Sequence, residues 1–245
     1  MGKVIAVVSG KGGTGKTTAV GAIGSCLAAM GNSTLCVDCD SGLRNLDITL
    51  GMTGFAVSDL SRVIDGEYTL EEAIMKHPNI ENLSFLDAPP FYRVEYDLQK
   101  AKDIFAKIRE NFDFCLLDAP AGIGPDVSFV ASLADMAIIV ATGDASSIRD
   151  GQVMSAMLRE AGISDVRLLV NRVRGKMFSA TGSTVDNMID AIGARLIGVI
   201  KEDREVTLSA NLEMPLVLYS RKVAAKGFLK VAQRLAGVDV PISVK

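Results

Sequence analysis

The sequence has a single histidine, few cysteines and no long apolar segment, and each scarcity excludes a class of protein. A Ser-His or Cys-His catalytic arrangement would depend on His77, which lies beside Pro78 in what we expect to be a polar loop. No run of about eighteen apolar residues occurs, which excludes a transmembrane helix, and we expect no signal peptide before the first predicted strand. The formal net charge of -3 gives no overall attraction to nucleic acid or anionic lipid.

The cysteines are not predicted to bind metal. Cys36 and Cys39 form a C-x-x-C pair, but no second pair or histidine cluster completes a metal site. An offset of three residues places their thiols on opposite faces of a strand. We therefore expect buried core thiols in a reducing cytoplasm, and hence a cytoplasmic protein. The full set is Cys26, Cys36, Cys39 and Cys115.

Short apolar runs alternate with amphipathic stretches along the 245 residues. Most runs are continuous, as in strands buried on both faces of a parallel sheet. A βα alternation implies right-handed crossovers and an α/β fold, a doubly wound, mostly parallel sheet with helices on both faces. An apolar content of 49% is enough for one large core, so we expect one domain over residues 1–245. The clearest helix is predicted over residues 94–110, and the strands over 4–8, 34–37, 83–86, 114–117, 136–141, 166–170 and 196–200.

A glycine-rich segment joins the first predicted strand to a helix-compatible run of small residues. Residues 10–17 match G-x-x-x-x-G-K-[ST], a pattern typical of a phosphate-binding loop in this context. The glycines let backbone N–H groups turn inward around an anion, and the helix N-terminus adds about half a positive charge. We expect Lys16 to reach the β- and γ-phosphates and the Thr17 hydroxyl to ligate Mg²⁺. The nucleotide would be held by Gly10, Lys11, Gly12, Gly13, Thr14, Gly15, Lys16, Thr17 and Thr18.

A second lysine stands early in this loop. Lys11 is not needed to hold a nucleotide within one chain, and from this residue alone a solvated loop charge is an equal alternative. Residues 11–18, Lys-Gly-Gly-Thr-Gly-Lys-Thr-Thr, are similar to the deviant Walker A motif of the MinD/ParA family of ATPases. The resemblance implies a SIMIBI-type P-loop NTPase fold. In that family the early lysine reaches the phosphates of a dimer partner, so Lys11 predicts a homodimer that forms on ATP binding.

Aspartates follow two of the predicted strands, at the edge where parallel sheets bind ligands. Asp38 and Asp40 come after the second strand and could lie near Mg²⁺ and the γ-phosphate, although an Asx turn is an alternative explanation. Asp118 ends an apolar run, which is a Walker B pattern. That pattern is weak alone but strong beside a phosphate-binding loop.

Two segments around these aspartates resemble the switch regions of the same family, residues 42–47 and residues 118–123. The resemblance implies that Asp40 positions or activates the attacking water. It also implies that the Gly122 amide senses the γ-phosphate. The implied metal ligands are Thr17, Asp38 and Asp118, and the implied catalytic groups are Lys11, Lys16 and Asp40.

Two further segments concern the nucleotide base. The sequence from Asn171 places Arg174 where the guanine-reading motif Asn-Lys-x-Asp has its final Asp, and an arginine cannot accept the guanine N–H groups. This disfavours GTP. By resemblance Asn171 hydrogen-bonds adenine, with an Asx turn as the alternative. Asp203 corresponds to a base-packing Pro-x-Asp motif of the family, but Lys201 replaces the proline.

Residues 143–150 are predicted to open a helix that Ser146 or Ser147 caps. Residues 215–218 are predicted as a short last strand and 222–236 as a helix with an apolar stripe and several cations. Such a helix could lie on a membrane, but burying its large apolar side chains contributes roughly 6–12 kcal/mol, so we favour a core helix.

The segment after that helix, residues 237–245, is short and contains Pro241. We therefore expect no C-terminal membrane-targeting helix, and contact with the inner face of the membrane is left open.

The resemblance covers nearly the whole chain and predicts an ATPase that dimerises on binding ATP and Mg²⁺, hydrolyses ATP to ADP and phosphate, and acts as a spatial switch in division-site placement. The expected protein partners are a division inhibitor and an ATPase stimulator, with no specific nucleic acid.

Other functions are alternatives with requirements of their own. A ParA-like partition ATPase would need a basic surface, and a flagellar-number regulator would need an N-terminal extension. A metal-cluster or electron-transfer ATPase would need paired cysteines at the dimer face, and a ligase would need a substrate pocket that we cannot identify.

Overall fold

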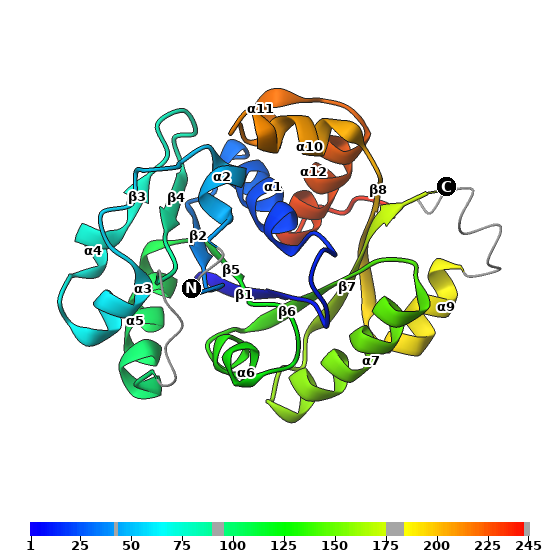
Figure 1. The fold of residues 1–245 in the computed structure, drawn as a ribbon, viewed down its shortest axis with the longest axis horizontal. Coiled ribbons are helices and arrows are strands. Elements are labelled where there is room, and N and C mark those ends of the chain that lie inside the picture. The colour runs from blue at the N-terminus through cyan, green and yellow to red at the C-terminus, as the bar shows by residue number, and fades with distance from the viewer. Residues whose placement is uncertain (42–43, 90–95, 175–183, 243–245) are drawn as a thin grey trace.

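The computed structural model describes residues 1–41, 44–89, 96–174 and 184–242, and it contains an eight-stranded sheet in the order β3-β4-β2-β5-β1-β6-β7-β8 (Figure 1). All neighbouring strands are parallel except β3 and β4, which are antiparallel. The expected α/β class with a mostly parallel sheet is therefore confirmed. The strands are β1 (Lys3–Val8), β2 (Thr34–Asp38), β3 (Met75–Lys76), β4 (Leu83–Leu86), β5 (Phe114–Asp118), β6 (Met136–Ala141), β7 (Val166–Val173) and β8 (Arg195–Lys201).

Helices cover both faces of the sheet (Figure 1). One face packs against α1 (Lys16–Ala29), α2 (Leu46–Leu50), α10 (Arg204–Asn211), α11 (Leu216–Tyr219) and α12 (Val223–Leu235). The other face packs against α3 (Leu60–Asp65), α4 (Leu70–Ala73), α5 (Leu98–Asn111), α6 (Pro125–Ser132), α7 (Ala145–Glu160) and α9 (Val185–Ile192).

Each central strand contributes side chains to both cores, which explains the continuous apolar runs. On β1, Val4, Ala6 and Val8 enter one core cluster while Ile5 and Val7 enter the other, and all are fully buried. Successive side chains of a strand point to opposite faces, so a strand covered on both sides must be apolar throughout. This layering fixes the carboxyl ends of β1, β2 and β5 side by side.

Two predicted elements differ in the structure, and one observed strand was not predicted. Helix α5 begins at Leu98, capped by Asp97, and the predicted start at residue 94 lies outside the described residues. The predicted strand over 215–218 is wrong: α11 follows Pro215, whose carbonyl accepts from the Tyr219 N–H. Proline has no N–H to give to a sheet and favours the start of a helix, which the apolar sequence alone does not reveal. The antiparallel strand β3 was not anticipated.

The histidine is also placed differently from our expectation. His77 is buried rather than in an open polar loop, with 6% of its surface exposed. Its Nδ1 accepts from the backbone N–H groups of Asn79 and Ile80, and its Nε2 lies 2.8 Å from the Leu50 carbonyl. Burial lowers the pKa of His77, so a neutral ring joins two loops of the core.

The four cysteines are free thiols, and three are buried. Cys36 and Cys39 pack against opposite core clusters, as their spacing predicts.

The C-terminal helix α12 packs on the core, as expected. Phe228 and Val231 are almost fully buried, whereas Leu229 is 36% exposed and contributes less than we expected. Within the described part of the chain, no helix is long and apolar enough to cross a membrane.

Close packing of α12 on β8 depends on Gly198, and this makes a testable prediction. A Cβ atom at Gly198 would lie 2.5 Å from Cγ2 of Val231. Gly198→Ala is therefore expected to lower the free energy of unfolding by about 1–3 kcal/mol through overpacking. Urea denaturation measures this loss. Gly124→Ala is the matched control, because a Cβ there meets nothing within 4 Å, and an equal loss in both variants would contradict the prediction.

Candidate active site

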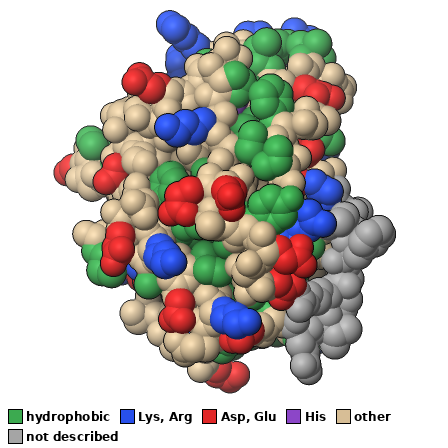
Figure 2. All heavy atoms as spheres, turned by 90° about the vertical axis from the view of Figure 1, so that its left-hand side faces the viewer, with side chains coloured by type: hydrophobic (Ala, Val, Ile, Leu, Met, Phe, Trp, Pro, Cys, Tyr) green, Lys and Arg blue, Asp and Glu red, His purple; other side chains and the backbone are tan. Residues whose placement is uncertain are grey.

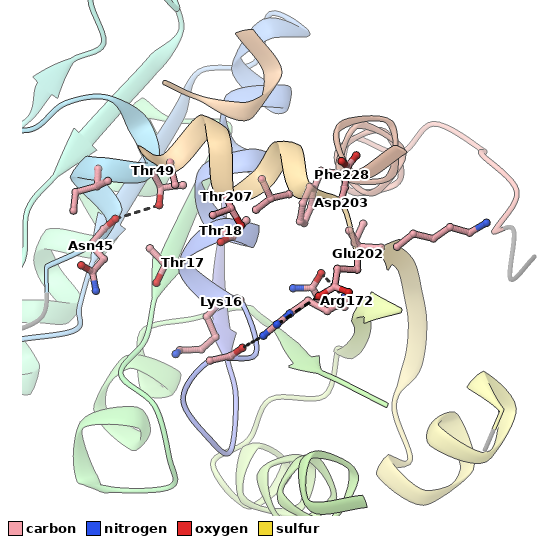
Figure 3. A pocket seen from close by; sticks show the side chains of 18 residues that line it. Lys16, Thr17, Thr18, Asn45, Thr49, Arg172, Glu202, Asp203, Thr207 and Phe228 are labelled. Carbon is pink, nitrogen blue, oxygen red and sulfur yellow. Dashed lines mark hydrogen bonds and ion pairs between the residues drawn. The ribbon is translucent and has the colours of Figure 1, made fainter. Parts of the chain in front are cut away.

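A cleft of ≈ 570 Å³ opens at the N-terminus of α1, between α2, α10 and the ends of β7 and β8. Figure 3 shows Lys16 and Thr17 toward one end of this cleft, with Asp203 and Phe228 toward the other. The cleft lies at the carboxyl edge of the sheet, where open α/β sheets bind their ligands. Gly13, Gly15, Thr18 and Asn171 also line it.

The loop between β1 and α1 has the strand–loop–helix context that its motif requires. Gly13 and Gly15 have φ angles of 78° and 94°, a left-handed backbone that favours glycine. A Cβ at Gly15 would lie 2.4 Å from Nδ2 of Asn171, and one at Gly10 would lie 2.4 Å from Cβ of Asp150. Larger residues at these positions would displace the loop from the helix N-terminus. Gly12 and Gly13 form its exposed tip, while Thr14 and Lys16 are buried.

Two buried carboxylates lie at the ends of adjacent strands. Asp38 on β2 and Asp118 on β5 are direct ladder partners. The carboxylate of Asp38 accepts from the N–H groups of Asp40 at 2.8 Å and Leu46 at 3.2 Å, and so ties the segment before α2 to the sheet. Burial, with mutual repulsion, raises the pKa of Asp38 to about 7, and burial raises that of Asp118 to about 7.

The donor set around Asp118 fits a magnesium ion. Its Oδ1 is buried and has no hydrogen-bond partner among the described residues, and the Thr17 hydroxyl bonds to this carboxylate. An unpartnered buried carboxylate oxygen is costly unless a cation satisfies it. Carboxylate and hydroxyl oxygens are the hard ligands that Mg²⁺ prefers. Asp38 lies beside this pair, but its oxygens already accept backbone N–H groups.

Asp40 lies close to the lysine of the loop. Partial burial raises its pKa, the Lys16 ammonium lowers it, and the neighbouring Asp126 raises it. The Lys16 ammonium also lowers the pKa of Asp118. One cation therefore lies within electrostatic reach of both carboxylates, as expected where phosphates and a metal ion bind.

The raised pKa values predict a pH-dependent stability of the nucleotide-free protein. Between about pH 4 and 7 the folded carboxyl pair binds more protons than the unfolded chain, so the free energy of unfolding falls as pH rises through this window. At about 1.4 kcal/mol per pKa unit, the expected loss is on the order of 4 kcal/mol for each raised carboxyl, measured by urea denaturation in a chelator. Asp118→Asn should flatten this dependence, and Glu110→Gln, at an exposed position, should not. A wild-type slope in Asp118→Asn would contradict the prediction.

Lys11 points to the start of α7 in this structure. Its Nζ lies 2.6 Å from Oδ1 of Asp144 and 2.8 Å from the Ser146 hydroxyl. Asp144 also caps α7 by accepting from the Ser147 N–H, so the expected serine cap is wrong. A carboxylate is preferred here because it satisfies both the helix terminus and the lysine. The action of Lys11 on a partner subunit remains a prediction.

Three predicted binding groups have protein partners in this structure. The Asn171 amide donates to the Thr14 carbonyl at 2.8 Å, and its oxygen accepts from the Arg172 N–H at 2.9 Å. The carboxylate of Asp203 accepts from the N–H groups of Glu205 and Ala224, which joins α10 to α12. The Gly122 amide donates to the Ser9 carbonyl at 3.0 Å. Their contacts with nucleotide remain predictions.

Arg172 and Glu202 are site residues that the sequence interpretation missed. Arg172 has a φ of 55°, rare for a non-glycine residue, at an irregularity of β7. Its guanidinium donates to the Gly13 carbonyl at 3.0 Å and lies 3.6 Å from Glu202 (Figure 3). Together with Asn171, it fixes the tip of the loop from β7. The only signal in the sequence was the position of Arg172 after a strand.

Comparisons with known proteins agree with this geometry. The family model described as "AAA domain" matches residues 2–160. The chain is 31% identical over 249 residues to the septum site-determining protein MinD of Bacillus subtilis, covering 100% of this chain and 92% of that protein. It is also 33% identical, with a TM-score of 0.91 and 98% coverage of both chains, to a chain of the MinC:MinD cell division protein complex of Aquifex aeolicus.

A third similar structure contains a bound nucleotide. The chain is 28% identical, with a TM-score of 0.85 and 96% coverage of both chains, to MinD of Pyrococcus horikoshii complexed with Mg-ADP. Family match, full-length identity and fold all agree with the deviant loop motif. The chain therefore belongs to the MinD/ParA family of deviant Walker A ATPases and is a MinD-type ATP hydrolase.

Proposed function

We propose that this chain is an ATP-driven dimerisation switch that takes part in placing the division site. The observation that carries the proposal is its likeness to MinD proteins over its whole length rather than over the P-loop alone. ATP binding would join two subunits face to face, and hydrolysis to ADP and phosphate would separate them. A protein partner of the kind seen in the MinC:MinD complex would recognise the ATP-bound dimer.

The loop residues divide the work of holding ATP. The left-handed glycines Gly13 and Gly15 turn the backbone so that N–H groups surround the phosphates, at the positive end of α1. Lys16 neutralises charge on the β- and γ-phosphates. Lys11 would add a second ammonium group from the partner subunit. Phosphoryl transfer depends mainly on positioning and charge neutralisation, so these groups supply most of the required stabilisation.

Thr17 and Asp118 would hold Mg²⁺, with Asp38 beside them. When bound, the ion supplies charge neutralisation for the phosphates. Asp38 also keeps the segment that carries Asp40 in place through the Asp40 N–H. Asp40 would then accept a hydrogen bond from water and orient it for in-line attack on the γ-phosphate.

The other end of the cleft would hold the adenosine. Ile200, Val206 and Phe228 provide apolar walls there. Asp203 lies at this end and Asn171 lies against the loop, and either would need to exchange or share its present backbone partner to contact the base. Specificity for adenine is also supported by Arg174, which cannot replace the guanine-reading carboxylate.

The experiment is to measure the molecular mass by light scattering with Mg²⁺ and a non-hydrolysable ATP analogue, with ADP or with GTP. We expect a dimer with the ATP analogue only. In a second step a MinC protein is added, and we expect it to bind the analogue-loaded dimer. Absence of dimers would overturn the switch. Dimers that do not bind MinC would overturn the division-site role but leave the proposed dimerisation switch intact.

A further inference from the structure

A second cavity, which shares Lys201 with the nucleotide cleft, is a groove of ≈ 250 Å³ between the edge strand β8 and helix α12. Four cations line it, from the end of β8 and along α12, together with apolar side chains. The cations are Lys201, Lys226, Lys230 and Arg234. No residue lining this groove carries a carboxylate. The chain as a whole is acidic, so this concentration of positive charge runs against its net charge of -3. Figure 2 shows a different face, where acidic and basic side chains are interspersed.

These cations have no carboxylate partner in the described part of the chain. Lys201, Lys226 and Lys230 make no ion pair there, although the same helix has a paired lysine at its start, Lys222 with Glu205. Arg234 is half-buried, and its guanidinium already donates to the backbone carbonyls of Ile197 on β8 and of Val240 and Pro241 after α12. Each ammonium group therefore keeps its donors available for an anion.

The packing of α12 on β8 places these cations around one groove. Lys226, Lys230 and Arg234 are four residues apart, which places them along one side of α12. Gly227 allows that side to approach β8, because a Cβ there would lie 2.9 Å from Cδ1 of Ile200. A narrow groove of this kind suits a small ligand better than a flat surface does. Lysines that converge on one cavity strengthen binding of a multiply charged anion, since each adds Coulomb energy at short range.

We propose that the groove between β8 and α12 binds the phosphate group of a small anionic ligand, clasped by Lys201, Lys226 and Lys230. A phosphate offers only acceptors and up to two negative charges, which matches ammonium donors with no competing carboxylate. The apolar walls, Val199 and Ile242, accommodate the carbon portion of an ester. Lys201 also lines the nucleotide cleft, so this residue is left unchanged in the test.

The test uses the whole chain loaded with Mg²⁺ and ADP, so that the P-loop is occupied. Inorganic phosphate is titrated while the amide signals of Val199 and Gly227 are followed by NMR. We expect saturable shifts in the wild type and about tenfold weaker binding in the double variant Lys226→Gln/Lys230→Gln. The control variant Lys102→Gln/Lys107→Gln removes the same charge from the exposed side of α5 and should bind like the wild type.

A second arm separates a soluble ligand from a lipid headgroup. Vesicles of phosphatidylglycerol and of phosphatidylcholine are sedimented with the same proteins. If the wild type binds inorganic phosphate and the double variant does not, the ligand is a free phosphate compound. If the wild type and the control variant sediment with phosphatidylglycerol vesicles and the double variant does not, the ligand is a phospholipid headgroup. Absence of wild-type binding in both arms, or equal weakening in the control variant, would overturn the proposal.

Discussion

Replacing Lys16 by alanine is expected to lower the rate of ATP hydrolysis by about 10²–10³-fold and to weaken ATP binding. Only 6% of the lysine surface is exposed, and its ammonium group lies within electrostatic reach of Asp40 and Asp118. Without that cation, the phosphates would meet the two carboxylates with less positive charge between them. The resulting repulsion destabilises both bound ATP and the transition state, so the affinity for ATP and the turnover rate should decline together.

Phosphate release measures turnover, and a fluorescent ATP analogue measures affinity. Lys102→Ala, on the exposed side of α5, is the control for loss of one lysine and should leave both unchanged. Thermal unfolding of the free proteins checks that Lys16→Ala is folded. A folded Lys16→Ala protein that hydrolyses ATP within about threefold of the wild-type rate would contradict the proposed role of this ammonium group.

The loop and the strands could be predicted because their signals are local. The spacing of Gly10, Gly15, Lys16 and Thr17 is fixed by how a backbone wraps an anion at a helix start. The buried strands could be recognised as continuous apolar runs, because helices cover both faces of the sheet. Asp38 and Asp118 were expected together because parallel strands end at one edge, and the ladder pairs them directly.

The missed features depend on contacts between distant parts of the chain. Arg172 adopts its left-handed backbone at an irregularity in the pairing of β7 with β8, and its guanidinium bonds a carbonyl 159 residues away. Asp144 caps α7 instead of a serine because it also pairs with Lys11, 133 residues earlier. Local propensity ranks aspartate and serine alike at such a position, so only the tertiary contact distinguishes them.

The contact between Lys11 and Asp144 bears directly on dimer formation. The lysine must leave this ion pair before it can reach the phosphates of a partner. Partial burial raises the pKa of Asp144, but hydrogen bonds from Lys11, Thr142, Ser146 and Ser147 hold it well below its usual range. Both charged side chains are more than a third exposed, at 34% and 41%, so solvent screens the pair and its strength is at most about 1 kcal/mol.

Two substitutions at this contact should therefore act in opposite directions. Lys11→Ala removes the ammonium group from the shared site and is expected to weaken ATP-dependent dimerisation by about 100-fold or more. Asp144→Asn frees the lysine but keeps an oxygen to cap α7, and should strengthen the dimer by about two- to fivefold. Sedimentation equilibrium with Mg²⁺ and a non-hydrolysable ATP analogue gives both dissociation constants.

The controls separate release of the lysine from a general change of charge. Asp186→Asn removes one exposed carboxylate from the first turn of α9 and should leave the dimer unchanged. In the double variant Lys11→Ala/Asp144→Asn the gain from Asp144→Asn should vanish, because there is no lysine left to release. A gain that persists without Lys11 would mean that Asp144 opposes the dimer by its own charge. Unchanged dimerisation and turnover in Lys11→Ala would remove the lysine from the shared site altogether.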